Sequence, residues 1–366
     1  MIPLAKPYID KKDIKEVERV LKSGRLSLGP KINEFERFFA KIIGTKYAVA
    51  VNSGTSGLHL CVRSLGIKEG DEVITSPFSF VASANCMLFE KAKPIFADVD
   101  EDTFNLNPNL IEDKITSRTK AILPVHVFGQ SCDMSKIINI AKKHNLKVIE
   151  DACESLNSTY KNKKVGTFGD AAVFAFYPNK QITTGEGGMI VTNNKKTAEA
   201  CRSMRNQGRG ESMQWLTHEQ LGYNYRITDM QAALGISQLK KIDFLINQRR
   251  KVVAMYMNEL SEIPQVKSPV VDKFNTHTWF VFPIQVSEKD RDRLIEHLLK
   301  EGIQSKAYFY PPIHLQPFYK KSFGYRKGDF PVAEKISKTT LILPMFVGMT
   351  RKEVINVKNS IIKFYC

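Results

Sequence analysis

Short apolar runs that alternate with helical patterns narrow the choice of fold more than anything else in this sequence. Several of the runs are separated by helical patterns such as 56–65 and 133–144. The predicted strands are residues 47–52, 72–76, 94–98, 120–126, 146–152, 171–176 and 188–193. This order predicts an α/β fold in which helices cover a seven-stranded, mainly parallel sheet. Ligands of such sheets bind beyond the carboxyl ends of the strands, so the polar residues after each run are the candidates for function.

The chain is long enough for one large domain and a smaller one. It has 366 residues, 43% of them hydrophobic, and can bury a full core. A long helical pattern from about residue 230 leads into a second unit, which contains an apolar run at 278–286 and a helix over 289–301. We therefore predict a large domain over residues 1–245 and a smaller C-terminal α/β domain over residues 246–366.

The N-terminal segment contains two predicted amphipathic helices and no targeting signal. The first helix has Ile14, Val17 and Leu21 on one face and ends before Gly24. No basic segment is followed by an apolar one, and no apolar run approaches the roughly 18 residues of a membrane helix. We expect a soluble, cytoplasmic protein that does not insert into a membrane.

The formal net charge of +16 has more than one interpretation. It can reflect nucleic-acid binding, contact with an anionic membrane surface, attraction of a phosphorylated small substrate, or simply a lysine-rich solvated surface. The lysines are spread along the chain, without zinc-finger spacing or an RNA-binding aromatic signature, so nucleic acid is not an expected partner. The six cysteines are scattered without a C-x-x-C pair, which indicates neither a metal site nor a disulfide framework.

The segment Ser53-Gly54-Thr55-Ser56-Gly57 follows the first predicted strand and precedes a helical pattern. Free backbone N–H groups at a helix N-terminus, with hydroxyl groups beside them, form an anion site, and phosphate is the natural ligand. An ordinary helix cap by Ser53 or Thr55 explains the same residues. There is no G-x-G-x-x-G or G-x-x-x-x-G-K-[ST] motif, which leaves dinucleotide and P-loop sites without support.

Two charged residues follow later strands. Asp151 lies at the carboxyl edge of the strand 146–152, where a buried carboxylate requires a cationic partner, although a capping role explains it equally well. Lys180 lies between the strand 171–176 and a glycine-rich turn, and lysine is the amine that forms Schiff bases with carbonyl groups. A surface lysine is the simpler interpretation of Lys180 alone. The order of phosphate site, acid and lysine, each after a strand, favours a shared site.

These motifs resemble those of the DegT/StrS-type sugar-nucleotide aminotransferases over nearly the whole chain. The matching segments are Pro3–Pro7, Ser23–Pro30, Asn52–Ser56, Pro124–His126, Glu150–Ala152, Lys180 with Thr183–Gly188, Gly222–Asp229, Gln231–Gly235 and Pro311–His314. The resemblance implies a fold-type I transferase dependent on pyridoxal phosphate, with the aspartate aminotransferase fold. It also implies transfer of an amino group, with glutamate as donor, to a nucleotide-linked keto sugar for polysaccharide, glycan or antibiotic sugar synthesis.

The resemblance also implies individual roles. Lys180 is similar to the Schiff-base lysine, Asp151 to the partner of the pyridine nitrogen, and Thr55 and Ser56, with Gly54, to the phosphate site. Phe80 matches an aromatic residue that stacks on the cofactor, although core packing in a helix 80–89 is an alternative.

Further roles concern the substrate and a second subunit. Asn224 resembles a residue that crosses to the phosphate of a neighbouring subunit, which implies an obligate homodimer with shared sites. Arg205, Tyr310 and His314 are candidates for contact with the sugar or diphosphate.

Two positions depart from the common pattern. Ala175 stands where many members have a phosphate-binding serine, so one hydrogen bond to phosphate is missing or replaced. Glu154, a candidate cofactor contact, stands where glutamine or histidine is common, and it resembles members that aminate carbon 4 of the sugar, such as perosamine synthases.

Two other functions within the same cofactor class remain open. They are a sugar dehydratase, whose known members have histidine in place of Lys180, and a catalytically silent cofactor-binding regulator.

Overall fold

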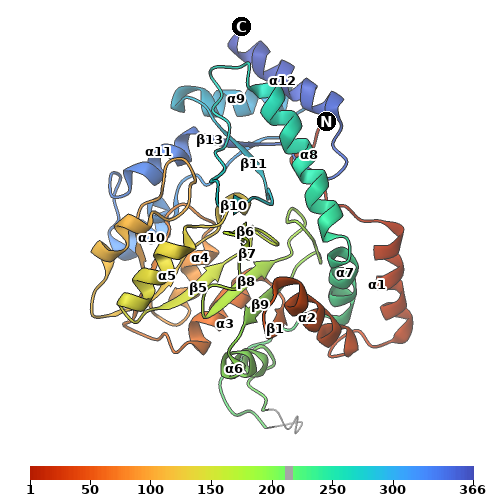
Figure 1. The fold of residues 1–366 in the computed structure, drawn as a ribbon, viewed down its shortest axis with the longest axis vertical. Coiled ribbons are helices and arrows are strands. Elements are labelled where there is room, and N and C mark those ends of the chain that lie inside the picture. Colours follow the sequence, from red (N-terminus) through yellow and green to blue (C-terminus); the bar gives the residue numbers. More distant parts are fainter. Residues whose placement is uncertain (211–216) are drawn as a thin grey trace.

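The computed structural model of the protein describes residues 1–210 and 217–366. Its largest sheet has seven strands in the order β1-β9-β8-β5-β4-β2-β3 (Figure 1). Strand β9 runs antiparallel to both of its neighbours, and the other six strands are parallel to one another. These strands are β1 (Tyr47–Val51), β2 (Glu72–Thr75), β3 (Lys93–Phe96), β4 (Thr119–Leu123), β5 (Lys147–Asp151), β8 (Ala171–Ala175) and β9 (Gly188–Thr192). Each predicted run overlaps one of them, which confirms the predicted seven-stranded sheet.

Helices cover both faces of this sheet. Successive residues of a strand point to opposite faces. In β1, Ala48 and Ala50 pack in one apolar cluster with residues of α2 (Pro30–Ile43) and α7 (Asp229–Leu239). Val49 and Val51 pack in another cluster with residues of α3 (Gly54–Ser64). The remaining helices of this unit are α4 (Ala82–Leu88), α5 (Met134–Lys143) and α6 (Lys195–Arg205).

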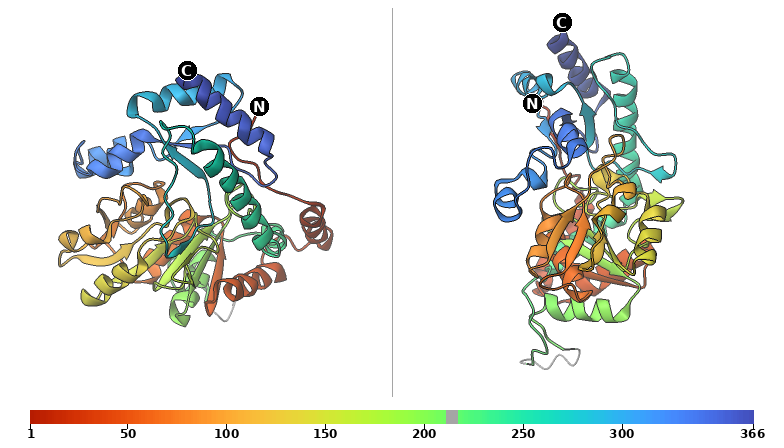
Figure 2. Two further views of the ribbon diagram at one scale, coloured as in Figure 1. Left: turned by 45° about the horizontal axis from the view of Figure 1, so that its top comes forward. Right: turned by 90° about the vertical axis from the view of Figure 1, so that its left-hand side faces the viewer.

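A smaller group of elements lies at the C-terminal end of the chain, above the large sheet in Figure 1 and in both views of Figure 2. Helix α8 (Ile242–Leu260) leads into it. Its antiparallel sheet has the order β11 (Phe282–Gln285), β13 (Thr340–Leu343) and β12 (Lys306–Ala307). Helices α9 (Glu288–Lys300) and α12 (Arg351–Tyr365) contribute to its core. The expected smaller α/β unit is therefore present.

The division into domains at residues 245 and 246 stays a prediction. This boundary falls inside the single helix α8. The N-terminus also reaches the C-terminal unit, because the Ile2 N–H donates to the Gly302 carbonyl at 2.7 Å. The shorter elements are β6 (Thr159–Tyr160), β7 (Lys163–Lys164), β10 (Asn275–Thr276), α10 (Pro317–Phe323), α11 (Pro331–Thr339), and the 3-10 turns Pro108–Leu110, Glu112–Lys114, Val127–Gly129 and Ile313–Leu315.

Helix α1 (Lys11–Ser23) buries one acidic residue, Asp13, beside the apolar Val20. Ile14 and Leu21 are 60% and 53% exposed, whereas Asp13 is fully buried. The Asp13 carboxylate accepts hydrogen bonds from Lys241 at 2.6 Å and from Gln238 at 2.8 Å. This ion pair, together with the buried Val20, sets which side of α1 faces the rest of the chain, and Ile14 and Leu21 stay exposed.

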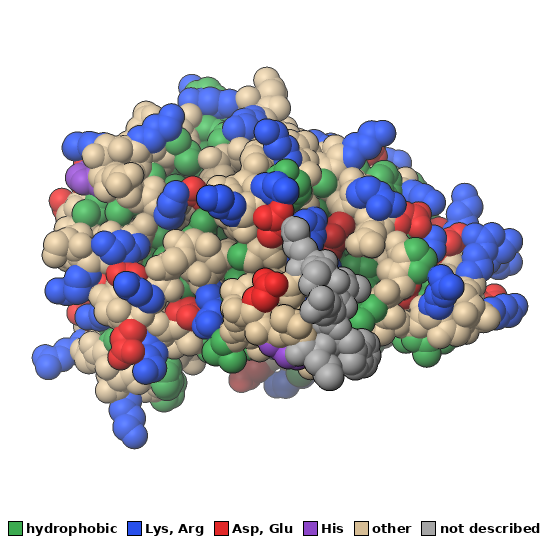
Figure 3. Space-filling view, turned by 90° about the horizontal axis from the view of Figure 1, so that it is seen from below, with side chains coloured by type: hydrophobic (Ala, Val, Ile, Leu, Met, Phe, Trp, Pro, Cys, Tyr) green, Lys and Arg blue, Asp and Glu red, His purple; other side chains and the backbone are tan. Residues whose placement is uncertain are grey.

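Basic side chains are distributed over the surface. Figure 3 shows Lys and Arg side chains spread over the lower face, with Asp and Glu side chains between them. This distribution fits the interpretation of the net charge as a solvated surface on that face. Within the described part of the chain, no helix is both long enough and apolar enough to span a bilayer.

Candidate active site

The carboxyl ends of β1, β5 and β8 bring three predicted functional segments to one edge of the sheet. A methyl group added to Gly54 would lie 2.9 Å from both the Ala175 Cβ and the Cys153 Sγ, so only glycine fits there. Burial raises the pKa of the Cys153 thiol well above its ordinary value, and the Asp151 carboxylate raises it further, while Lys180 opposes the change. Cys153 therefore lies at a point where the phosphate segment, the acid and the lysine meet.

The N-terminus of α3 combines a helix cap with unused donors. The Ser53 hydroxyl accepts from the Ser56 N–H at 3.1 Å, so Ser53 caps the helix as the alternative interpretation expected. The Ser56 hydroxyl donates to the Asn52 side-chain oxygen at 2.6 Å. The Thr55 hydroxyl makes no hydrogen bond within the described residues. A cap uses only one N–H group, so this terminus can still bind an anion.

Asp151 is a buried carboxylate, 4% exposed, at the end of β5. Its Oδ2 accepts from the Ser83 hydroxyl at 2.7 Å, and its Oδ1 accepts from the Cys153 N–H at 3.1 Å. The Ser79 hydroxyl lies 2.7 Å from that of Ser83 and continues the chain of hydroxyl groups. No cationic group within residues 1–210 and 217–366 forms an ion pair with Asp151. A buried carboxylate without a cation favours a ligand that supplies a positive charge.

The Lys180 amine lies between a carboxylate and an aromatic ring. Its Nζ is 3.5 Å from the Glu154 Oε1 and 3.8 Å from the centre of the Phe280 ring. Glu154 is 6% exposed, and its Oε2 accepts from the Phe128 N–H at 2.9 Å. Burial raises the pKa of Glu154 above its ordinary value, although the Lys180 charge opposes this. Lys180 and Glu154 together can therefore hold and exchange a proton at the sheet edge.

A cavity of about 590 Å³ opens beside this edge. Phe80 and Tyr310 line it, and both are more than half exposed, at 62% and 52%. The core-packing alternative for Phe80 is therefore wrong, because α4 begins only at Ala82 and Phe80 precedes it. Ser79 also lines the cavity and so joins it to Asp151 through Ser83.

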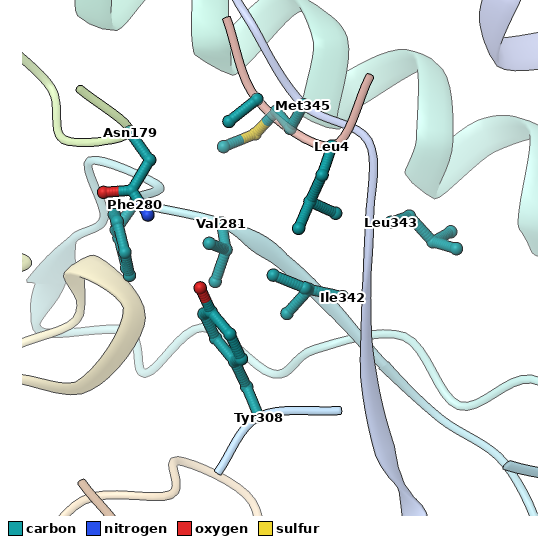
Figure 4. A pocket seen from close by; sticks show the side chains of 9 residues that line it. Leu4, Asn179, Phe280, Val281, Tyr308, Ile342, Leu343 and Met345 are labelled. Carbon is teal, nitrogen blue, oxygen red and sulfur yellow. The ribbon is translucent and has the colours of Figure 1, made fainter. Parts of the chain in front are cut away.

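Tyr308 lines both this cavity and a second pocket of about 20 Å³. Figure 4 shows its hydroxyl end directed toward Val281 in the smaller pocket. Burial, with a further contribution from Glu154, raises the pKa of Tyr308 to about 12. Tyr308 therefore keeps its proton at neutral pH and can donate it in a hydrogen bond.

Two of the predicted substrate residues have structural partners and do not line the cavity. His314 is fully buried, and its Nε2 lies 3.1 Å from Glu334. The Arg205 guanidinium forms an ion pair with Glu36 and donates to the Ala50 carbonyl at 2.6 Å. These contacts give both side chains a role in packing, and they do not support contact with a substrate.

Asn224 is exposed, in a segment beside the phosphate site. Its carbonyl accepts from the Asn52 side-chain amide at 3.4 Å, and the carbonyl of Tyr225 accepts from the Asn52 N–H at 2.9 Å. The Asn224 side chain is therefore open to contact with a second molecule.

Sequence reasoning missed three residues of this edge. Ser83 holds Asp151, Cys153 fills the space beside Gly54, and Phe280 lies against the Lys180 amine. Only Cys153 had a sequence signal, because it follows Asp151 by two residues.

The chain matches one protein family and is similar to several aminotransferases of known structure. Residues 7–362 match the model of the DegT/DnrJ/EryC1/StrS aminotransferase family. The chain is 40% identical to the GDP-perosamine synthase of Escherichia coli O157:H7, over 100% of this chain and 98% of that protein. The structure of Helicobacter pylori PseC, an aminotransferase of pseudoaminic acid biosynthesis, is 32% identical, with a TM-score of 0.94 over 100% and 99% of the two chains. Bacillus subtilis NtdA with bound PMP is 29% identical, with a TM-score of 0.90 over 97% of this chain and 82% of that one.

Proposed function

Because the chain belongs to the DegT/DnrJ/EryC1/StrS aminotransferase family, we propose that it transfers the amino group of glutamate to a nucleotide-linked keto sugar. Membership makes it a sugar aminotransferase that uses pyridoxal phosphate. The observation that carries the proposal is the cavity of about 590 Å³. One residue that lines it, Ser79, is connected to Asp151 by hydrogen bonds through Ser83. This volume suits a ligand of nucleotide-sugar size, since such sites occupy about 300–1,000 Å³.

The residues at the sheet edge fit pyridoxal phosphate. The N-terminus of α3 at Gly54, Thr55 and Ser56 would hold the phosphate group. Asp151, buried without a cation in the described residues, would receive the protonated ring nitrogen. Phe80 is free to stack on the ring. When bound, this cofactor supplies an aldehyde for attachment to a lysine and a ring that accepts electrons.

Lys180 would serve as both anchor and base. Its amine would move a proton between the α-carbon of the amino donor and the 4′ carbon of the cofactor, and in the second half of the reaction it would move a proton in the reverse direction to the carbon of the sugar. The Glu154 carboxylate, 3.5 Å from the amine, can accept a proton from the Lys180 ammonium group and so leave a neutral amine that can act as a base. Asp151 would favour the same steps electrostatically, since a fixed carboxylate stabilises positive charge on the ring.

The keto sugar that we propose is a nucleotide-linked 4-keto-6-deoxyhexose. Two observations support it, namely the 40% identity to a GDP-perosamine synthase and the glutamate at position 154. The net charge of +16 would attract its diphosphate. We propose that the product enters the synthesis of a surface polysaccharide, glycan or antibiotic sugar, and that the enzyme acts in the cytoplasm.

The test is an assay of purified enzyme with glutamate and a panel of nucleotide-linked 4-keto and 3-keto sugars. Amino sugar and 2-oxoglutarate should form together, with the highest kcat/KM for a 4-keto-6-deoxyhexose. Loss of a sugar hydroxyl without amine incorporation would show a dehydratase. Cofactor binding without any turnover would support a silent regulator.

Ala175→Ser should strengthen cofactor binding. The Ala175 methyl lies against Gly54 at the phosphate site, so a hydroxyl added there can donate to the phosphate. A hydrogen bond to a charged group contributes about 1.5–3 kcal/mol, or roughly tenfold or more in affinity. Titration of the apoenzyme with pyridoxamine phosphate measures this, and Ala171→Ser, at the other end of β8, serves as the control. An unchanged dissociation constant would show that Ala175 does not face the phosphate.

We propose a homodimer in which Asn224 reaches the phosphate of the neighbouring subunit. The exposed Asn224 side chain and the exposed apolar residues Ile14 and Leu21 support an interface between copies of this chain. An apolar patch of this kind often marks a subunit contact.

A mixture of two inactive variants tests the shared site. Lys180→Ala and Asn224→Ala, which must itself be inactive, are unfolded together and refolded. Half of the dimers should be hybrids, and each hybrid collects both defects in one site and leaves the other intact. Roughly a quarter of the wild-type activity should therefore return. Hybrids that are isolated by two tags and remain inactive would place both residues in one subunit's site.

A further inference from the structure

Arg249 is a buried cation without an acidic partner. It lies on α8 and is 4% exposed. Within the described residues no carboxylate forms an ion pair with it, and its Nε has no acceptor. Burial lowers the pKa of Arg249 to about 10. A charge that is costly to bury must have contacts that hold it in place.

Those contacts are four backbone carbonyls from two distant segments. Nη1 donates to the carbonyls of Trp279 and Phe280, both at 3.2 Å. Nη2 donates to the carbonyls of Asn179 at 3.4 Å and Lys180 at 2.9 Å. The planar fork of arginine can serve two pairs of acceptors at once, which lysine cannot do. Arg249 therefore fixes the backbone of Lys180 to that of Phe280.

The backbone at Trp279 and Phe280 has a conformation that allows both carbonyls to contact Arg249. Trp279 has a φ of 55°, a left-handed value that is rare for a residue other than glycine, asparagine or aspartate. In an extended strand, successive carbonyls point in opposite directions. The turn at Trp279 instead lets two successive carbonyls reach the same Nη1.

The same segment encloses the Lys180 amine. The Phe280 ring lies 3.8 Å from the Nζ of Lys180, and the Phe280 N–H donates to the Phe128 carbonyl at 2.8 Å. The Phe128 N–H donates to Glu154, whose other oxygen is 3.5 Å from the Nζ. The Lys180 amine therefore lies between the Phe280 ring and the Glu154 carboxylate, and Arg249 links the backbone of Lys180 to that of Phe280.

We propose that Arg249 and Phe280 are positioning residues for the Lys180 amine. Arg249 fixes the lysine backbone relative to the ring, and the ring with Glu154 fixes the amine at the end of its long side chain. An amine that leaves and rejoins a carbonyl in every turnover needs one defined position to which it returns. The inference rests on the proposed role of Lys180.

The experiment measures covalent attachment separately from binding. Apoenzyme is mixed with pyridoxal phosphate, and the rise in visible absorbance gives the attachment rate. Pyridoxamine phosphate, which has no aldehyde, gives the non-covalent affinity of the same site. Arg249→Lys and Arg249→Met should attach the aldehyde about tenfold or more slowly. Their affinity for pyridoxamine phosphate should stay close to that of the wild type.

Two further variants separate positioning from general packing. Phe280→Leu keeps the carbonyl contacts of Arg249 and should slow attachment to a smaller degree. Arg291, also buried, donates to the Ser337 carbonyl at 3.3 Å in the C-terminal unit, and Arg291→Lys is the matched control. It should lower the unfolding temperature while attachment remains at the wild-type rate.

The inference is overturned if folded Arg249→Lys attaches the cofactor at the wild-type rate. If both Arg249 variants fail to fold, wild-type attachment in Phe280→Leu overturns it instead. Peptide mapping of the reduced wild-type enzyme distinguishes this failure from that of the proposed function. If the label is on Lys180 and the variants attach the cofactor at the wild-type rate, only the positioning roles are contradicted. If the label is on another lysine, both proposals are contradicted.

Discussion

Lys180→Ala will abolish both the covalent attachment of pyridoxal phosphate and amino transfer. Alanine has no amine to attach to the aldehyde and no base to move the proton of the amino donor. The phosphate site at Gly54–Ser56 does not involve Lys180, so the variant should still bind the cofactor without a covalent bond. The visible absorbance of the purified variant and its turnover with glutamate measure the two losses.

Lys164→Ala is the matched control for this change. Lys164 is also partly buried, but its Nζ donates to the Ile42 carbonyl at 2.6 Å, away from the sheet edge. This variant should keep its colour and its turnover. A Lys180→Ala enzyme that still attaches the aldehyde and turns over would show that another amine performs the chemistry.

Asp151→Asn will lower kcat by a hundredfold or more while the cofactor remains bound. The amide keeps the size of the carboxylate and can still contact Ser83, but it is neutral and cannot hold a proton on the ring nitrogen. Loss of one fixed electrostatic partner costs roughly 10²–10³ in rate. Steady-state kinetics measure the loss, and a thermal unfolding curve shows whether the fold is intact.

Ser83→Ala provides a graded comparison for Asp151. It removes the 2.7 Å hydrogen bond to the carboxylate but leaves the negative charge. Its effect on kcat should therefore be smaller than that of Asp151→Asn. Near-normal turnover in Asp151→Asn would contradict the assignment and make Asp151 a structural residue.

The sheet could be predicted because each of its strands contains a short apolar run. Helices cover both faces of β1, so every residue from Ala48 to Val51 is buried and the strand contains no polar interruption. Residues after such strands meet at one edge, which is why the sequence alone groups Asp151 with Lys180.

Partners distant in sequence explain what could not be predicted. The sequence makes His314 and Arg205 candidates for ligand contact because it does not reveal their structural partners. His314 contacts Glu334, 20 residues away, and Arg205 contacts Glu36, 169 residues away. Arg249 lies 69 residues after Lys180 and gives no local signal of its contact with that backbone. In α1, periodicity located the helix, but the ion pair between Asp13 and Lys241 decided its orientation.

Chemical reduction of the holoenzyme tests the central assignment most directly. Borohydride converts the link between lysine and cofactor into a stable amine, and mass spectrometry of the digested protein locates it. A single modified peptide is expected, with the cofactor on Lys180 between Pro178 and Gln181. A cofactor found on any other lysine, or no modified peptide from a yellow enzyme, would contradict it.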